Sequence, residues 1–286
     1  MQERDRTCLI TGANRGIGKA AAIALAGRGQ HVVIVCRDRA RGELACREIE
    51  AASGAASVGL LVADLASLES VRQLASEARQ ALPPLGVLIH NAGVFMNDCE
   101  RTGDGVETTF AVNHLAPFLL THELLDHLAP EARIVTVSSE AHRGARLRLD
   151  DLQLERSYSG SLAYANSKLA NILFTRELAR RLKQAGRFVT ANSLHPGVIE
   201  TGLLDKYFRE YGWLGRLLQR FSGLFTVSPE KGAATTVHLA SAPEVAGVSG
   251  GYFKRCREVQ PSRAARDDET AKRLWELTEA LTTPRS

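Results

Sequence analysis

The sequence predicts an α/β protein: one domain over residues 1–286, built on a doubly wound parallel sheet of about seven strands. Short apolar runs alternate with longer helical segments, at roughly 25–35 residues per unit, as in parallel strands joined by helices. The run at 31–36 is almost wholly apolar and β-branched, which is typical of a strand covered on both faces. No linker-like Gly, Ser or Pro stretch and no repeat divides the chain, which favours a single domain.

The expected strands are short runs rich in Val, Ile and Leu, each followed by a turn or a helical pattern. The first precedes a Gly-rich turn, and the last is a short run near the end of the chain. In chain order we expect them at 6–10, 31–36, 58–62, 87–90, 133–137, from 188–192 onward, and 251–253.

The expected helices lie between these strands. The helix at 19–28 is rich in Ala, and the helix at 39–52 is strongly charged on its outer positions. Four more are expected at 68–81, 105–128, 161–184 and 266–281. Pro117 should bend the helix over 105–128. The least regular stretch, about 198–228, should be an insertion after the sixth strand.

Composition places the chain among ordinary soluble globular proteins, with 44% hydrophobic and 24% charged residues. No run approaches the roughly 18 apolar residues that a membrane span requires, and the charged start at 1–6 lacks a signal-peptide core, so a cytoplasmic location is expected. A net charge of +4 without a clustered Lys/Arg strip argues against a nucleic-acid partner. Five scattered cysteines without a C-x-x-C pair, and histidines without an H-E-x-x-H pattern, predict reduced thiols and no metal site.

The first turn, 11–18, reads T-G-A-N-R-G-I-G and lies between an expected strand and an expected helix. Its glycines let the backbone approach a pyrophosphate, and the following helix offers unpaired N–H groups and the positive end of its dipole. The pattern predicts a dinucleotide site of the Rossmann type, with a purely structural glycine turn as the alternative. The expected cofactor contacts here are Gly12, Asn14, Arg15, Gly16, Ile17 and Gly18.

The spacing T-G-x-x-x-G-I-G resembles that of the short-chain dehydrogenase/reductase family, and further motifs extend the resemblance over nearly the whole chain. Asn91-Ala92-Gly93 matches N-A-G, although His90 stands where the family usually has Asn. Stretches 35–38, 167–174, 194–197 and 273–275 are most similar to the retinol dehydrogenase branch. The resemblance implies further cofactor contacts from Asp64, Leu65, Asn91, Ala92, Gly93, Tyr164, Lys168, Pro196, Gly197, Val198 and Thr201.

The same resemblance implies a catalytic group of Asn113, Ser139, Tyr164 and Lys168, the last two in a Y-x-x-x-K motif. Tyr164 and Lys168 stand four residues apart, so they share one face of a helix. A nearby ammonium and the charge of an oxidised nicotinamide should lower the pKa of the phenol, which is ordinarily about 10. Tyr164 would then exchange the proton of the substrate oxygen. Ser139 would bind that oxygen, and the family role of Asn113 is to anchor a water that relays protons to Lys168.

Three other side chains compete for these roles. Ser138 is the rival of Ser139, which we prefer because it aligns with the second serine of the family's V-S-S motif. His195 directly precedes the Pro-Gly turn and is expected to be structural. His142 either lines the mouth of the pocket or lies behind it.

The end of the second strand predicts NADP(H) as the cofactor. An acidic residue at that place would bind the ribose 2′-hydroxyl, whereas a basic one accommodates the 2′-phosphate. Here the strand ends in Arg37, and Arg15 in the Gly-rich turn can reach the same phosphate. Asp38 should cap the next helix instead of facing the phosphate.

Residues 207–225 carry apolar side chains at near-helical spacing, with basic residues on the other side. This stretch is interpreted as a lid over a hydrophobic substrate, with a helix resting on a membrane surface or a packed surface helix as alternatives. The sequence thus predicts an NADP(H)-dependent oxidoreductase of hydrophobic alcohols, aldehydes or ketones, retinoid-like ones included. A dinucleotide-binding regulatory protein with little turnover is the alternative. The resemblance also implies a homodimer or homotetramer through helices 105–128 and 161–184.

Overall fold

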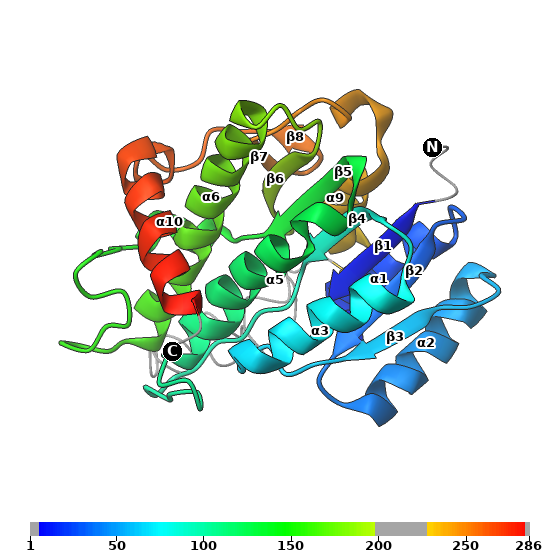
Figure 1. Cartoon of the computed structure of the whole chain (residues 1–286), viewed down its shortest axis with the longest axis horizontal. Coiled ribbons are helices and arrows are strands. Elements are labelled where there is room, and N and C mark those ends of the chain that lie inside the picture. Colours follow the sequence, from blue (N-terminus) through cyan, green and yellow to red (C-terminus); the bar gives the residue numbers. More distant parts are fainter. Residues whose placement is uncertain (1–5, 198–227, 284–286) are drawn as a thin grey trace.

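The computed structural model describes residues 6–197 and 228–283, which form a central sheet with helices on both faces (Figure 1). The sheet has eight strands in the order β3-β2-β1-β4-β5-β6-β7-β8, and only β8 runs antiparallel to its neighbour. The strands are β1 (Thr7–Thr11), β2 (His31–Cys36), β3 (Gly59–Val62), β4 (Leu85–His90), β5 (Leu128–Val137), β6 (Thr190–His195), β7 (Tyr252–Lys254) and β8 (Arg257–Glu258). The α/β class expected from the sequence is confirmed, with eight strands in place of about seven.

Six helices cover the two faces of the sheet. One face carries α1 (Gly16–Ala26), α2 (Arg39–Ser53) and α9 (Pro229–Ser241), and the other carries α3 (Leu68–Ala81), α5 (Ala116–Leu124) and α6 (Gly160–Gln184). Alternate residues of each strand enter the two layers: Cys8 and Ile10 of β1 pack with the first set of helices, and Leu9 packs with the second. Both faces bury apolar surface, which is why the central strands are apolar at nearly every position.

The last helix, α10 (Asp268–Thr282), lies along α6 on the outside of the second layer (Figure 1). Arg176 of α6 pairs with Asp268 at 2.8 Å, and Trp275 packs against the aromatic residues of α5 and α6. Within one chain, α5 and α6 are almost wholly buried. Helix α10 therefore covers part of α6, and its Trp275 reaches Phe118 of α5.

The helix expected over 105–128 is divided into shorter pieces. Helix α4 (Thr108–Phe110) starts late because the Glu107 carboxylate accepts hydrogen bonds from the first N–H groups of α4, at 2.7 and 2.9 Å. A π-helical turn, η2 (Ala111–Leu115), separates α4 from α5, and a 3-10 turn ends α5 just before β5. Pro117 lies in the first turn of α5, a place that proline tolerates. The helix was expected to bend at Pro117. The irregularity that the structure shows is the π-helical turn just before that residue.

Two elements were not predicted. Ser228 caps the start of helix α9, and its side chain accepts a hydrogen bond from the Lys231 N–H at 3.4 Å. Strand β8 has only two residues and pairs with β7 through a tight hairpin. The remaining expected strands and helices are confirmed to within a few residues at their ends, and β2 and α3 have the expected bounds.

The strand order reverses at β1, which lies between β2 and β4. Helix α1 follows β1 on one face of the sheet, and the helices after β4 lie on the other. At such a switch point the connections diverge and leave a crevice at the carboxyl ends of the strands, where ligands bind in α/β proteins. The Gly-rich turn and the Asn91-Ala92-Gly93 motif both lie at this end.

Candidate active site

The Gly-rich turn between β1 and α1 has the geometry that a pyrophosphate requires. Gly12 and Gly16 adopt φ angles of 66° and 58°, the left-handed region that glycine occupies without strain. Among the described residues, no side chain caps α1, and its first turn holds no acidic residue. A Cβ at Gly18 would lie 2.6 Å from the Gly12 carbonyl oxygen, so the turn depends on glycine there. The site therefore fits the phosphates of a dinucleotide.

Asn91 fastens the turn to the end of β4. Its side-chain Nδ2 donates hydrogen bonds to the carbonyls of Thr11 and Gly12, at 2.9 and 3.0 Å. In return, Thr11 Oγ1 accepts hydrogen bonds from the Asn91 and Ala92 N–H groups, both at 3.1 Å. Asn91 was expected to contact the cofactor, which stays a prediction; here its amide shapes the Gly-rich turn itself.

Tyr164, Lys168 and Ser139 lie together at the carboxyl end of β5. Lys168 Nζ lies 5.5 Å from the centroid of the Tyr164 ring, and the Ser139 hydroxyl lies near enough to Tyr164 to lower the pKa of its phenol. Ser139 Oγ accepts a hydrogen bond from the Ala141 N–H at 3.2 Å, which leaves the Ser139 proton for another acceptor. The helical spacing and the strand end thus bring the three side chains to one place.

Two effects act on the pKa of Tyr164 in the protein by itself. Burial raises this pKa to about 12, although the neighbouring Ser139 hydroxyl acts in the opposite direction. The expected lowering combines Lys168 with the charge of an oxidised nicotinamide and stays a prediction. Burial also lowers the pKa of Lys168 to about 8. Lys168 Nζ donates a hydrogen bond to the Val137 carbonyl at 3.0 Å.

Asn113 lies in the π-helical turn η2 and ties three segments together. Its Oδ1 accepts a hydrogen bond from the Val94 N–H at 2.8 Å, and its Nδ2 donates to the Val94 carbonyl and to Ser167 Oγ, both at 3.0 Å. A Cβ at Gly93 would lie 3.4 Å from both Asn113 Oδ1 and Lys168 Nζ. Gly93 therefore lies between the Asn113 side chain and the ammonium of Lys168, and the expected relay role of Asn113 stays a prediction.

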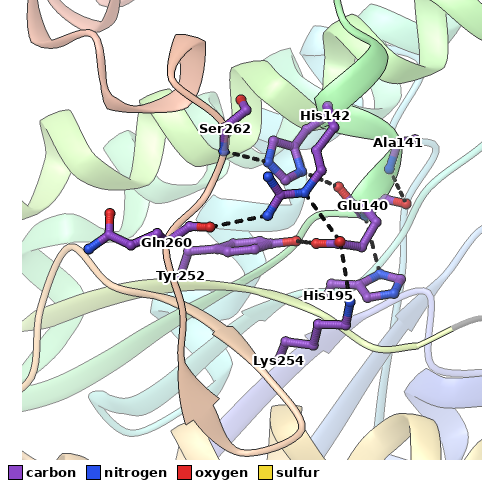
Figure 2. Close-up of polar contacts among 10 residues, drawn as sticks. Glu140, Ala141, His142, His195, Tyr252, Lys254, Gln260 and Ser262 are labelled. Carbon is purple, nitrogen blue, oxygen red and sulfur yellow. Dashed lines mark hydrogen bonds and ion pairs between the residues drawn. The ribbon is translucent and has the colours of Figure 1, made fainter.

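The competing side chains have structural partners. Ser138 Oγ donates to the Lys168 carbonyl at 2.7 Å, deep inside the protein, which supports the choice of Ser139. His195 Nδ1 accepts a hydrogen bond from the Glu140 N–H at 3.3 Å, and burial lowers the pKa of His195 to about 4. His142 is buried behind Ser139, where its Nδ1 donates to the Ser139 carbonyl at 2.7 Å (Figure 2).

The two arginines expected at the 2′-phosphate are exposed, Arg15 in the turn and Arg37 after β2. Within residues 6–197 and 228–283, neither guanidinium makes a side-chain hydrogen bond or ion pair. Asp38 caps α2: its Oδ1 accepts a hydrogen bond from the Arg41 N–H at 2.9 Å. Asp38 was expected to cap this helix, and its carboxylate is occupied by the hydrogen bond at the start of α2.

The other expected contacts lie around the same crevice. Asp64 shapes the turn after β3, where its Oδ1 accepts a hydrogen bond from the Ala66 N–H at 3.0 Å beside the half-buried Leu65. Pro196 and Gly197 follow β6, and Gly197 has a φ angle of 101°. Val198, Thr201 and the 207–225 segment lie outside the described residues, as does nearly all of the expected insertion over about 198–228.

Three residues of the site were not singled out from the sequence. Thr11 belongs to the T-G motif, so the motif could have indicated its role in joining the turn to Asn91 and Ala92. Phe95 is buried against Tyr164, with ring centroids 5.7 Å apart. Glu140 follows Ser139 directly, and its carboxylate accepts hydrogen bonds from Tyr252 and Lys254. These partners lie more than a hundred residues away along the chain, so no local pattern could have revealed them.

Two searches bear on other classes of site. In the part of the chain that the structure describes, no three His, Cys, Asp or Glu side chains are grouped so that they could hold a metal ion. Over those same residues, no helix combines the length and the apolar character that a membrane crossing needs.

The fold and the site define a class: an α/β protein with a dinucleotide crevice and a Tyr–Lys–Ser group beside it. The family model for short chain dehydrogenase matches residues 6–212. The chain belongs to this family of oxidoreductases. The resemblance noted from the motifs, including the retinol dehydrogenase branch, is confirmed.

Known proteins resemble the chain over most of its length. It is similar to "Retinol dehydrogenase 14" of Homo sapiens, with 45% identity over 96% of this chain and 86% of that protein. A crystal structure of an uncharacterised protein from Mycobacterium paratuberculosis is similar at 37% identity with a TM-score of 0.79, covering 97% of this chain and 93% of the other. A short chain dehydrogenase from Burkholderia cenocepacia in complex with NADP is similar at 27% identity with a TM-score of 0.68, covering 87% and 95%.

Proposed function

We propose that the chain is an NADP(H)-dependent oxidoreductase that interconverts hydrophobic alcohols with aldehydes or ketones, retinoid-like molecules included. The observation that carries the proposal is that Tyr164 and Lys168 of α6 meet Ser139 at the end of β5, with Lys168 Nζ 5.5 Å from the Tyr164 ring. Similarity to a retinol dehydrogenase over 96% of this chain supports a retinoid-like substrate. Buried Phe95 packs against the Tyr164 ring and makes the surroundings of the phenol apolar.

The nicotinamide supplies or accepts the hydride when it is bound. Tyr164 donates a proton to the carbonyl oxygen in reduction, and with a pKa of about 12 its hydroxyl carries that proton at neutral pH. In oxidation the phenolate takes the hydroxyl proton, which requires the positive charges of Lys168 and of the oxidised ring to offset burial. The resting protonation state of Tyr164 therefore favours the reductive direction.

Ser139 and Lys168 orient the reacting groups. Ser139 Oγ already accepts the Ala141 N–H, so its own proton is directed at the substrate oxygen and fixes that oxygen near Tyr164. Lys168 donates to the Val137 carbonyl, and its remaining N–H groups are available to the ribose hydroxyls. Asn113 holds the loop after β4 beside the ammonium and is the proposed anchor of the relay water.

Arg15 and Arg37 support NADP(H) over NAD(H). Both guanidiniums are exposed at the crevice side of β1 and β2, where a 2′-phosphate would lie, and Asp38 is occupied at the start of α2. The related Burkholderia cenocepacia structure in complex with NADP is consistent with this choice.

Three accompanying expectations stay predictions. We expect a cytoplasmic enzyme in which residues 207–225 form the wall of the substrate site or rest on a membrane surface. We also expect a homodimer or homotetramer through helices 105–128 and 161–184, as the family resemblance implies.

The experiment is a panel of retinal, medium-chain aldehydes, steroids and quinones with NADPH, followed by the loss of NADPH absorbance. We expect turnover of one or more members, and a loss of at least about 100-fold in Tyr164→Phe, in which the proton donor is gone. Binding of NADPH to Tyr164→Phe, followed by its fluorescence, should be unchanged. Tight NADPH binding with no turnover of any carbonyl by the wild type would instead favour a regulatory dinucleotide-binding protein.

A further inference from the structure

The turn that carries Ser139 is held by side chains from a distant part of the chain. We call residues 252–262 the C-terminal strap; it comprises β7, β8 and the loop that follows. Glu140, next to Ser139, accepts hydrogen bonds from the Tyr252 hydroxyl at 3.0 Å and from Lys254 Nζ at 3.2 Å (Figure 2). Both donors lie on β7, so one carboxylate fastens the strap to the catalytic turn.

His142 makes a second connection between the same two segments. Its Nδ1 donates to the Ser139 carbonyl at 2.7 Å, and its Nε2 accepts a hydrogen bond from the Ser262 N–H at 3.1 Å. This pattern requires a neutral imidazole, and burial lowers the pKa of His142. Arg143 adds a third connection, because its guanidinium donates to Glu140 at 3.3 Å and to the Gln260 carbonyl at 3.1 Å.

The charges of this cluster favour an ionised Glu140. Partial burial raises the pKa of Glu140, but the hydrogen bonds from Tyr252 and Lys254 and the charge of Arg143 outweigh it and lower the pKa to about 2. The carboxylate is thus held between one hydroxyl and two cations. The backbone N–H of Glu140 donates a hydrogen bond to His195 Nδ1, which connects the turn to the end of β6 as well.

The strap is held in a costly backbone conformation, which indicates that its position matters. Arg255 and Cys256, at the tip of the β7–β8 hairpin, have φ angles of 52° and 59°, the left-handed region that side-chain-bearing residues avoid. Thr235 of α9 compensates in part, since its Oγ1 accepts a hydrogen bond from the Cys256 N–H at 3.2 Å. Such strain persists only where the surroundings fix it.

We propose that Glu140 is a positioning residue for the reaction: it fixes the direction of the Ser139 hydroxyl by anchoring the turn η4 (Glu140–Gly144) to the C-terminal strap. This inference rests on the proposed function. Ser139 caps η4 through the Ala141 N–H, so a rotation of η4 moves Ser139 Oγ relative to Tyr164. His142, on the same turn, supports the Ser139 carbonyl from behind.

The test is a double-mutant cycle between Glu140→Ala and Ser139→Ala, measured with NADPH and the best carbonyl of the panel. We expect Glu140→Ala to lower kcat by about 10- to 100-fold through misplacement of Ser139, with the binding of NADPH unchanged. In the Ser139→Ala background, the same change should have almost no further effect on kcat. Glu140→Gln, which keeps an acceptor for Tyr252, should recover part of the loss.

The control is Glu155→Gln, which breaks the exposed pair with Arg101 and should leave kcat unchanged. Thermal unfolding identifies any variant that fails to fold; if Glu140→Ala is one, Glu140→Gln replaces it in the cycle. An equal loss from the Glu140 change in both backgrounds, or no loss in wild-type background, would overturn the proposal. If Ser139→Ala and Tyr164→Phe both keep full turnover, the proposed function itself fails, and the positioning role with it.

Discussion

Trp275 of α10 stacks on Phe174 of α6, with ring centroids 5.9 Å apart and ring planes 21° apart. The edge of Phe118 of α5 meets the same indole at 4.8 Å, and the Arg181 guanidinium lies 4.4 Å from its centroid. One aromatic side chain thus joins α10 to both helices behind the active site. We predict that Trp275→Ala lowers the free energy of unfolding by about 3 kcal/mol, as measured by denaturant titration. Leu277→Ala, at an exposed position of α10, is the control and should cost little.

The tight packing of the Gly-rich turn makes Gly18 a sensitive position. An added Cβ would collide with Asn91 Nδ2 and would lie 2.6 Å from the Gly12 carbonyl oxygen, so the hydrogen bonds by which Asn91 joins the turn to β4 would have to break. We predict that Gly18→Ala weakens NADPH binding by about 100-fold, measured by fluorescence titration. Gly27→Ala at the other end of α1, where the nearest atom lies 3.3 Å away, should bind NADPH normally. Equal affinities of the two variants would contradict this account of the turn.

The choice of cofactor is tested at Arg37. Replacing this exposed guanidinium with a carboxylate removes the charge that would pair with a 2′-phosphate and supplies an acceptor for a 2′-hydroxyl. We predict that Arg37→Asp shifts the ratio of kcat/KM for NADPH over NADH toward NADH by at least about 100-fold. Arg39→Asp, at the exposed first residue of α2, serves as the charge control. A wild-type enzyme that already prefers NADH would show that the phosphate argument is wrong.

The order of strands and helices could be predicted because each strand carries its own signal. The β-branched run of β2 and the periodic pattern of α3 gave their bounds directly. Helix α9 was missed although Ser228 and Pro229 form a start signal, because the Ala- and Thr-rich residues after them lack a clear apolar stripe. The hairpin before β8 was missed because Arg255 and Cys256 occupy positions where Asn and Gly are the usual signal.

Within the site, the motifs identified the residues but not their electrostatics. Tyr164 and Lys168 were expected from their spacing, yet the pKa of Tyr164 rises because desolvation depends on Phe95 and other packing that no local pattern contains. The link from Glu140 to Tyr252 joins residues that only the order β5-β6-β7 brings together. Contacts of this kind depend on the whole sheet, so a motif cannot predict them.

Because burial lowers the pKa of histidines in the native protein, we expect the protein to become less stable in acid. Burial lowers the pKa of His114 to about 4, and His114 Nε2 lies 2.9 Å from Thr278 Oγ1 of α10. Below a pH of about 6.5 the unfolded chain takes up a proton that the native protein refuses, so the free energy of unfolding falls until the pH reaches about 4. We predict that His114 accounts for about 3 kcal/mol of this fall, and that His114→Gln flattens the pH dependence of unfolding. His122→Gln, at an exposed position of α5, is the control for the substitution itself.

Lys168 should reduce stability while it serves the reaction. Its side chain is 3% exposed, and burial lowers its pKa from 10.5 to about 8, so at pH 7 the native protein holds an ammonium that is poorly solvated. The difference corresponds to about 3 kcal/mol of lost stability below pH 8. The loss diminishes as the pH rises from about 8 toward 10, because the native protein releases the Lys168 proton while the unfolded chain still holds it. We predict that Lys168→Met abolishes turnover and yet raises the midpoint of thermal unfolding at pH 7.

The pH dependence separates this cause from a simple packing change. The stability advantage of Lys168→Met over the wild type should shrink between pH 8 and pH 10, because only the wild type gains from deprotonation of Lys168 in that interval. Lys231→Met, which removes an exposed ammonium on α9, should show no such trend. A destabilised Lys168→Met whose deficit is the same at every pH would mean that the hydrogen bond to the Val137 carbonyl outweighs the desolvation of the ammonium. We expect instead a stabilised Lys168→Met whose advantage shrinks as the pH rises. That result would show that the buried charge serves catalysis and lowers the stability of the fold.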